Sequence, residues 1–169
     1  MSSEFRNDLL ALIPSLRAFA FCLAQDRSQA DDLVYTSLIE IWSKHRFGKG
    51  TELRVAAFTV VDRQCRRRAQ KNPRSPHALE RSRAGGMERL LATFASLERD
   101  EREALSLIAV WGFTDDQAAR VCDIDTRTLG SRVTNAYLRL VRGLQQRSRA
   151  AGSDPVNIQH KRTKEGCDG

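Results

Sequence analysis

The chain has 169 residues, a length that suits one ordinary domain or two small ones. Its 28 Lys and Arg residues exceed its 21 Asp and Glu residues, and the formal net charge of +7 favours an anionic partner. No apolar run approaches the ~18 residues of a membrane span, and the N-terminus lacks the order of a signal peptide. We therefore expect a cytoplasmic protein without membrane insertion.

Cysteine and histidine spacing gives no sign of a metal site. The four cysteines form no CxxC pair, and the three histidines do not lie at ligand spacing. The sequence predicts no metal and no cofactor, and it favours free thiols in a reducing cytosol.

The N-terminal part of the chain predicts two helices. Apolar residues recur on one helical stripe between residues 5 and 23, and Pro14 either kinks or splits that helix. Ser28, followed by Asp31 three residues later, is a capping signature for a second helix, which carries apolar residues as far as Trp42.

A third helix is expected from about Glu52, and it becomes basic toward Lys71. The prolines that follow it cannot continue a helix, and the next residues are low in apolar content. Helical stripes then resume before a polar, basic C-terminus. The sequence predicts an all-α fold with two small helical domains, divided into a three-helix domain 1–71, a flexible linker 72–87, a second domain 88–147 and a disordered tail 148–169.

The second domain contains a predicted helix-turn-helix between residues 112 and 144. Thr114 and Gln117 have the spacing of a capping box, which predicts a short helix that residues 122–125 interrupt. A second helix begins at Thr126, with apolar residues at spacings of three and four.

The other face of this second helix carries Arg, Ser, Thr and Asn side chains, a set that suits base edges and phosphates in the major groove. An ordinary αα-hairpin with a solvated face explains the same pattern equally well. The hairpin pattern leaves both interpretations open.

Four stretches of the chain together resemble extracytoplasmic-function sigma factors of the general-stress-response type. They are LLALIPSLRAFAFCL (9–23), ADDLVYTSLIEIW (30–42), FGKGTELRVAAFTVV (47–61) and REALSLIAVWGFTDDQAARVCDIDTRTLGSRVTNAYLRL (102–140). The resemblance covers most of the chain outside the linker and the tail. It implies a transcription initiation factor whose partners are RNA polymerase core, promoter DNA and an anti-sigma factor.

The resemblance also implies a role for each stretch. The ADDLV helix of the family docks on the clamp helices of the largest polymerase subunits, which maps here to Asp31, Asp32, Leu33, Leu38 and Trp42. The alternative for the two carboxylates is that they offset the macrodipole in the first turn of a helix.

The family's third helix and the loop before it open the proximal promoter element, and its helix-turn-helix reads the distal one. The candidates for melting are Arg54, Arg63, Arg66 and Arg67, which could follow a single strand or alternatively form a solvated helix end. The candidates for distal recognition are Arg127, Thr128, Ser131, Arg132, Asn135 and Arg139, with Leu129 and Val133 expected in the core.

Two other hypotheses accompany the sigma factor. The family pattern has Gln, Trp, Asn and Lys at four positions where this chain has Tyr35, Ala56, Arg63 and Gly130. These differences support a sigma-like decoy that binds an anti-sigma factor without initiating transcription. An enzyme is the third hypothesis, but the sequence shows no nucleophile–base pair, metal spacing or phosphate loop, so we expect no catalytic activity.

Overall fold

The computed structural model describes residues 3–44, 50–71 and 86–151, and within these ranges the chain forms seven α-helices and no strand. The predicted all-α class is confirmed. The helices are α1 (Ser3–Ala24), α2 (Arg27–Lys44), α3 (Thr51–Lys71), α4 (Gly86–Ala95), α5 (Arg99–Ala109), α6 (Asp115–Cys122) and α7 (Thr126–Ala151).

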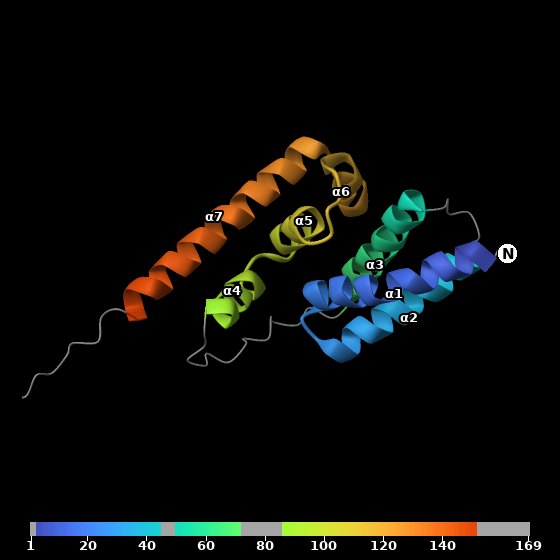
Figure 1. The fold of residues 1–169 in the computed structure, drawn as a ribbon, viewed down its shortest axis with the longest axis horizontal. Helices are drawn as coiled ribbons and strands as arrows, with labels where there is room; N and C mark the ends of the chain where they lie inside the picture. The colour runs from blue at the N-terminus through green and yellow to red at the C-terminus, as the bar shows by residue number, and fades with distance from the viewer. Residues whose placement is uncertain (1–2, 45–49, 72–85, 152–169) are drawn as a thin grey trace, which may run out of the picture.

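The helices form two groups that lie side by side (Figure 1). In the first group α1, α2 and α3 pack against one another, and in the second α7 runs along α4, α5 and α6. The groups touch where α3 packs against α6 and α1 packs against α5. Residues 72–85, which make up most of the predicted linker, lie outside the described residues, and Gly86 and Met87 already belong to α4.

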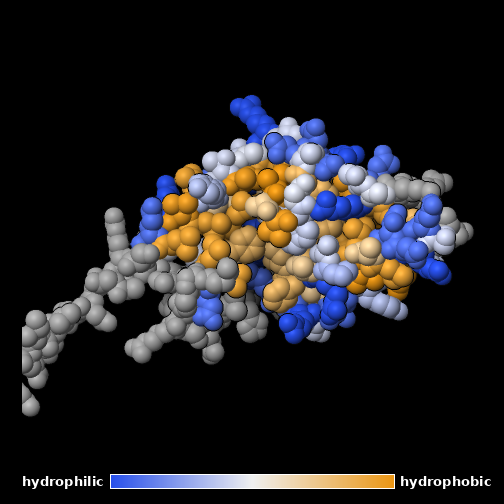
Figure 2. All heavy atoms as spheres, viewed as in Figure 1, coloured by the Kyte–Doolittle hydropathy of each residue, from blue (hydrophilic) through white to orange (hydrophobic). Residues whose placement is uncertain are grey.

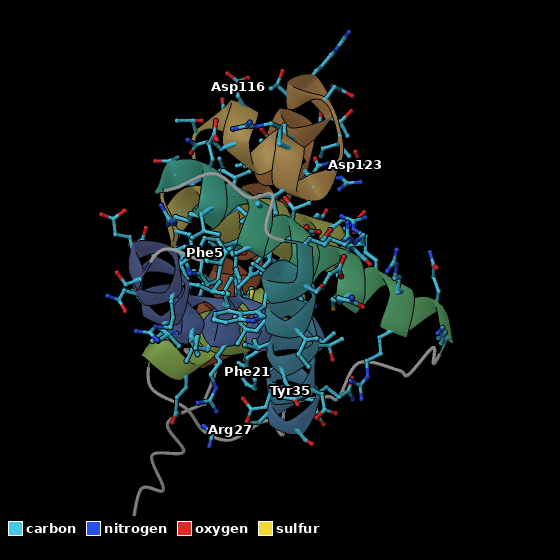
Figure 3. All side chains as sticks on the ribbon, turned by 90° about the vertical axis from the view of Figure 1, so that its right-hand side faces the viewer. Phe5, Phe21, Arg27, Tyr35, Asp116 and Asp123 are labelled. Carbon is cyan, nitrogen blue, oxygen red and sulfur yellow. The ribbon has the colours of Figure 1, made fainter. Side chains whose placement is uncertain are left out.

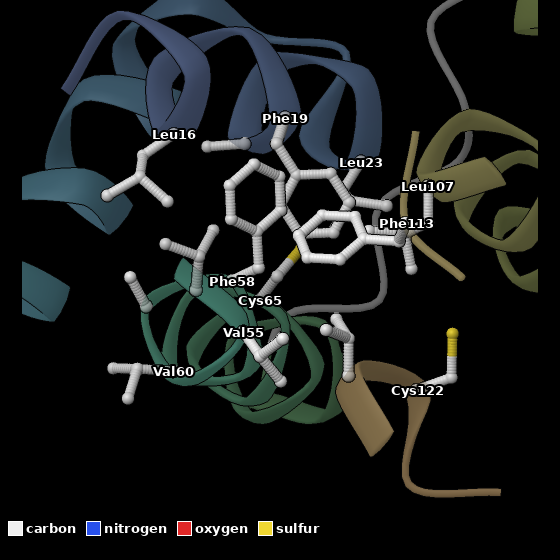
Figure 4. Packing of buried hydrophobic residues seen from close by; sticks show 14 of the residues in the cluster. Leu16, Phe19, Leu23, Val55, Phe58, Val60, Cys65, Leu107, Phe113 and Cys122 are labelled. Atoms are coloured by element: carbon white, nitrogen blue, oxygen red, sulfur yellow. The ribbon is translucent and has the colours of Figure 1, made fainter. Parts of the chain in front are cut away.

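Aromatic side chains join the cores of the two groups (Figure 4). The ring of Phe19 in α1 lies 4.9 Å from that of Phe58 in α3, and Phe58 lies 5.0 Å from Phe113 in the α5–α6 connection. Trp111 packs edge-on against both Phe19 and Phe58. Such pairs stabilise a core by ~0.5–1.5 kcal/mol each beyond their burial. The described helices therefore share one buried apolar cluster rather than two separate ones.

Side chains at three helix starts explain where those helices begin. Thr114 and Gln117 form the predicted capping box of α6. Asp125 accepts from the backbone and hydroxyl of Thr128 and so caps α7. The predicted cap at Ser28 is wrong, because the carboxylate of Asp26 accepts the amide of Gln29 at 2.8 Å and α2 begins at Arg27.

Two long helices continue past points at which the sequence suggested a possible break. α1 runs through Pro14 without splitting, so its apolar stripe stays continuous from Leu9 to Leu23. α7 continues to Ala151, past residue 148 where we expected the tail to begin, while 152–169 lie outside the described residues.

α1 is also long and apolar enough to cross a membrane, contrary to our expectation that the chain has no such run. Leu16, Phe19 and Ala20 are fully buried against the other helices, whereas Leu10 and Phe21 of the same helix are exposed. A core helix passes the same test of length and composition, so the finding is weak evidence for a membrane span.

Candidate nucleic-acid interface

α2 presents an apolar stripe to solvent. Tyr35, Ile39 and Trp42 are spaced to share one helix face, and all three are exposed, Trp42 by 44%. Figure 3 places Tyr35 at the opposite end of the molecule from Asp116 of α6. Of the predicted docking residues, Leu33 is buried and Leu38 is half-buried, so both pack inward. Trp42 is the predicted apolar docking residue that remains available to a partner.

The two carboxylates of α2 lie beside this stripe and are exposed. Asp31 pairs with Arg17 of α1 at 2.8 Å, and Asp32 pairs with Arg68 of α3 at 3.3 Å. Because α2 begins at Arg27, neither carboxylate lies in its first turn, and the helix-dipole explanation does not hold. Exposed ion pairs contribute ~0–1 kcal/mol, so both carboxylates can exchange partners at little cost.

The four predicted melting arginines of α3 do not form one open basic surface. Arg54 donates to the backbone carbonyl of Trp111 and stacks 4.4 Å from the ring centroid of Phe113. Arg63 pairs with Glu40 of α2, and Arg66 lies between α3 and α5. Arg67 is exposed to solvent.

The N-terminal half of α7 does present a polar face. Arg127, Ser131 and Asn135 are spaced by four residues and are exposed, so they share one outward side of the helix. Thr128 is half-buried and belongs to the cap at Asp125. Leu129 is buried and Val133 packs against the core, as the sequence predicted.

The two remaining arginines of the predicted recognition helix turn toward α5. Arg132 pairs with Asp100 at 2.9 Å, and Arg139 lies 3.3 Å from Glu101 and 3.7 Å from Glu98. In this arrangement their guanidinium groups are neutralised by carboxylates of the protein itself.

Arg66 and Arg132 belong to a cluster of ionic side chains between the two helix groups, which we name the ion cluster. Its members are Asp62, Arg66, Arg99, Asp100, Glu103 and Arg132. Asp62, whose side chain is 4% exposed, accepts from Arg66 of its own helix and from Arg99 of α5, each at 2.6 Å. Arg66 also reaches the fully buried carboxyl group of Glu103 at 2.9 Å. Each helix group thus supplies both charge signs to the contact.

Burial raises the pKa of Glu103 and of two nearby cysteines. It raises the pKa of Glu103 to about 8, assisted by the neighbouring carboxylate of Asp62 and opposed by Arg99 and Arg66. Burial likewise raises the pKa of Cys22 to about 11 and that of Cys65 above its usual value, so these thiols stay protonated and unreactive.

Sequence reasoning missed the carboxylates of the ion cluster. The signal was partly present, because Asp62 precedes Arg66, and Arg99 precedes Glu103, at the four-residue spacing of helical ion pairs. That spacing indicates pairs within one helix. It does not show that Asp62 also pairs with Arg99, or that Glu103 also pairs with Arg66, across the two helices.

No family model matches the chain. A curated protein described as the ECF RNA polymerase sigma factor EcfG, from Rhodopseudomonas palustris (strain TIE-1), is 32% identical over 153 residues, which cover 83% of this chain and 84% of that protein. The chain belongs to the extracytoplasmic-function sigma factors.

Two solved structures share the fold of this chain. RpoE of Bartonella quintana, solved in complex with the anti-sigma factor NepR, has a TM-score of 0.70 at 30% identity and covers 85% of this chain and 98% of its own. CnrH, solved with the cytosolic domain of CnrY, shares the fold at 19% identity, with a TM-score of 0.57 over 80% of this chain and 82% of its own. The fold is therefore shared with a solved sigma factor, RpoE.

The structure shows the surroundings of two positions at which this sigma factor differs from the family pattern. Gly130 lies on the exposed side of α7, and a Cβ atom there meets nothing within 4 Å. Ala56 is half-buried in α3, between buried Val55 and Ala57. The fold accommodates both residues.

Proposed function

We propose that this chain is an alternative sigma factor that binds RNA polymerase core and directs promoter-specific initiation in the cytoplasm. The observation that carries the proposal is the 32% identity to a sigma factor over 83% of the chain. An initiation factor needs one surface for the polymerase and another for the promoter, and α2 and α7 lie in different groups of the fold.

The polymerase surface we propose is the outer face of α2. Tyr35, Ile39 and Trp42 supply exposed apolar area, and Asp31 and Asp32 supply charge beside it. An apolar stripe flanked by carboxylates suits a helical partner that carries both apolar and basic side chains, because the charges guide the encounter while the apolar groups are buried on contact.

The promoter surface we propose is the outward face of α7, where Arg127, Ser131 and Asn135 are exposed. Arginine and asparagine side chains form bidentate hydrogen bonds with guanine and adenine in the major groove. Three further arginines contact the DNA once they leave the carboxylates with which they pair in this structure, namely Arg66, Arg132 and Arg139. Arg67 is already exposed.

We also propose control by an anti-sigma factor in a stress response. RpoE of Bartonella quintana binds the anti-sigma factor NepR and matches this chain over 85% of its length. Exposed apolar side chains occur on both helix groups, Leu10 and Phe21 in the first and Tyr137 and Leu138 in the second, and Figure 2 shows apolar surface on both. A partner that covers apolar area on both groups would hold the sigma factor inactive.

A second candidate is a sigma-like decoy that binds the anti-sigma factor without initiating transcription. It is favoured by Gly130, which leaves the exposed face of α7 without the cation of the family pattern, and by Ala56 in place of a tryptophan. The complex of PhyR with NepR from Bartonella quintana shares the fold at 20% identity, with a TM-score of 0.58 over 82% of this chain and 50% of that one.

Transcription in vitro separates the two candidates. Purified protein is mixed with core polymerase and stress-type promoters, with and without a candidate anti-sigma factor. Promoter-specific transcripts that the anti-sigma factor suppresses support the sigma factor. Tight binding to the anti-sigma factor with no transcript from any promoter supports the decoy instead.

A further inference from the structure

One partly buried carboxylate joins α2 to α3. Glu40 of α2, whose side chain is 15% exposed, accepts hydrogen bonds from two consecutive residues of α3. Arg63 donates to its Oε1, and Gln64 donates to its Oε2 at 2.7 Å. Lys44, one turn further along α2, also donates to Oε1. Both carboxylate oxygens are therefore bonded, and we name the contact of Glu40 with Arg63 and Gln64 the Glu40 bridge.

The donors keep Glu40 ionised at neutral pH. Partial burial would raise the pKa of this carboxyl group, but hydrogen bonds from Lys44 and Gln64 and the charge of Arg63 together lower the pKa below its usual value. Hydrogen bonds between a guanidinium and a carboxylate are about twice as strong as neutral ones. Solvent also screens a partly buried carboxylate less than an exposed one. The Glu40 bridge can therefore hold two helices in register, unlike an ordinary surface pair.

Arg63 faces α2 and does not offer a complete guanidinium to DNA. Its side chain is 40% exposed, but its Nη2 is bound to Glu40 and its Nε is buried. A bidentate phosphate contact uses two donors on one edge of the guanidinium, and each edge that can form such a contact includes Nη2. The family pattern has Asn at this position, so the arginine of this chain supplies a bridge and not a further cation for DNA.

The Glu40 bridge lies beside two surfaces of the proposed function. Glu40 directly follows Ile39 and comes two residues before Trp42, which both belong to the exposed stripe of α2. Arg63 comes one turn before the exposed Arg67 in α3. We propose that the Glu40 bridge fixes the orientation of α3 relative to the polymerase surface of α2, and that Arg63 acts through Glu40 rather than on DNA. The effect on transcription rests on the proposed function, whereas the contact between the two helices does not.

A fixed orientation matters because promoter opening engages the polymerase and the DNA at the same time. The stripe of α2 is proposed to bind the polymerase, and α3 is the helix expected to open the proximal promoter element. A small displacement of a positioned group slows a reaction strongly, although each surface keeps its own affinity. Loss of the bridge should therefore slow promoter opening and leave affinity for core polymerase unchanged.

Variants of Arg63 test the proposal, and a lysine of α2 provides the matched control. Arg63→Ala removes the charged half of the bridge, and Arg63→Asn introduces the residue of the family pattern. Lys44→Ala removes the same charge from the same oxygen of Glu40 but leaves α3 bonded to it. Arg67→Ala removes an exposed cation from α3. Circular dichroism checks the helix content of each variant, and Arg63→Asn keeps the test decisive if Arg63→Ala loses it.

The first measurement is a double-mutant cycle in urea unfolding with Glu40→Gln, Arg63→Ala and the double variant. If the two side chains act through each other, the effect of Arg63→Ala on the unfolding equilibrium constant should be about threefold smaller, or less, once Glu40 is neutral. Effects that simply add in the double variant overturn the proposal. This measurement needs neither DNA nor polymerase.

The second measurement is affinity for a labelled promoter duplex as a function of salt. Arg67→Ala should flatten the slope of log affinity against log salt by about 0.9 for one lost phosphate contact, whereas Arg63→Ala should leave the slope of the wild type unchanged. A slope that Arg63→Ala flattens as much as Arg67→Ala does would show that Arg63 contacts phosphate, and it overturns the proposal.

The third measurement is the rate of promoter opening with core polymerase, followed by a fluorescent base in the proximal promoter element. Opening should be about tenfold slower with Arg63→Ala or Arg63→Asn than with Lys44→Ala, the effect of losing one charged hydrogen bond, at equal affinity for core polymerase. Arg63→Lys keeps the charge and should recover part of the rate. Equal opening rates for Arg63→Ala and Lys44→Ala overturn the proposal.

The measurements distinguish failure of this inference from failure of the proposed function. A non-additive cycle, with no promoter opening by the wild type, supports the Glu40 bridge and contradicts the sigma factor. Promoter opening by the wild type, with an additive cycle, supports the sigma factor and overturns the role given to the Glu40 bridge.

Discussion

Arg99 of α5 donates a hydrogen bond over 2.6 Å to the buried carboxylate of Asp62 in α3, and this contact joins the two helix groups. The residues are 37 positions apart in the sequence, and the predicted linker lies between them. Unfolding of either group therefore removes a charged partner from the other.

The stability of the protein should fall as pH rises through the titration of Glu103. Burial raises the pKa of this carboxyl group from 4.5 to about 8, so between these values the folded state holds a proton that the unfolded state has released. The contribution of the protonated Glu103 to the free energy of unfolding is fully present below about pH 4.5 and is lost as pH approaches about 8. Urea unfolding across this pH range measures how steeply the free energy of unfolding falls with pH.

Glu103→Gln provides the comparison for that slope, because its amide cannot titrate. The free energy of unfolding of this variant should depend less on pH than that of the wild type, and the difference should reach a few kcal/mol across the range. Parallel curves for the two proteins would show that Glu103 does not carry the effect.

Two glycines of α7 should respond oppositely to alanine. A Cβ atom at Gly130 meets nothing within 4 Å, so Gly130→Ala should stabilise the protein by about 0.5–1 kcal/mol through helix propensity. A Cβ atom at Gly143 would lie 2.5 Å from Cγ2 of Thr93 in α4, so Gly143→Ala should lower the melting temperature. Thermal unfolding measures both, and a stabilised Gly143→Ala would show that α4 does not pack closely on α7.

Trp42→Ala should weaken binding to core polymerase without unfolding the protein. The side chain is 44% exposed on the stripe of α2, so its removal costs little core packing. We expect a loss of affinity of about 2 kcal/mol, the effect of removing an aromatic anchor from an interface. Leu10→Ala on α1, where Leu10 is 55% exposed, is the control, and an equal loss in both variants would remove α2 as the docking surface.

Arg127→Ala should reduce affinity for promoter DNA and flatten its salt dependence by about 0.9 for one lost phosphate contact. Arg127 lies on the outward face of α7 and is exposed. Arg6→Ala removes the same charge from an exposed position of α1 and should leave the slope unchanged. Fluorescence anisotropy at several salt concentrations compares them, and equal slopes for Arg127→Ala and wild type would place the DNA elsewhere.

The sequence predicted local features well because their causes are local. The apolar period of the second hairpin helix predicted buried Leu129, and the spacing of Thr114 and Gln117 predicted the capping box. Where two capping residues lie close together, the sequence did not decide which of them caps the helix. Asp26, not Ser28, caps α2, since both are good capping residues two positions apart.

The surface that each arginine faces could not be predicted from the sequence. The sequence places Arg66 in the basic part of one helix and Arg132 on the polar face of another. In the structure Arg66 contacts Glu103 and Arg132 contacts Asp100. Those contacts depend on how α3, α5 and α7 cross, which no local pattern encodes. The two-domain division did not predict the aromatic cluster of Phe19, Phe58 and Trp111, which joins the two helix groups.

The position of Arg102 limits how the protein can move. Its guanidinium is buried and bonded at once to Cys22 and Leu23 of α1 and to Ala95 and Leu97 beside α5. A partial slide of α1 would strand these donors in an apolar setting, whereas complete detachment would return them to water. Rearrangement should thus proceed in an all-or-none step between two discrete states, without a continuum of half-displaced forms.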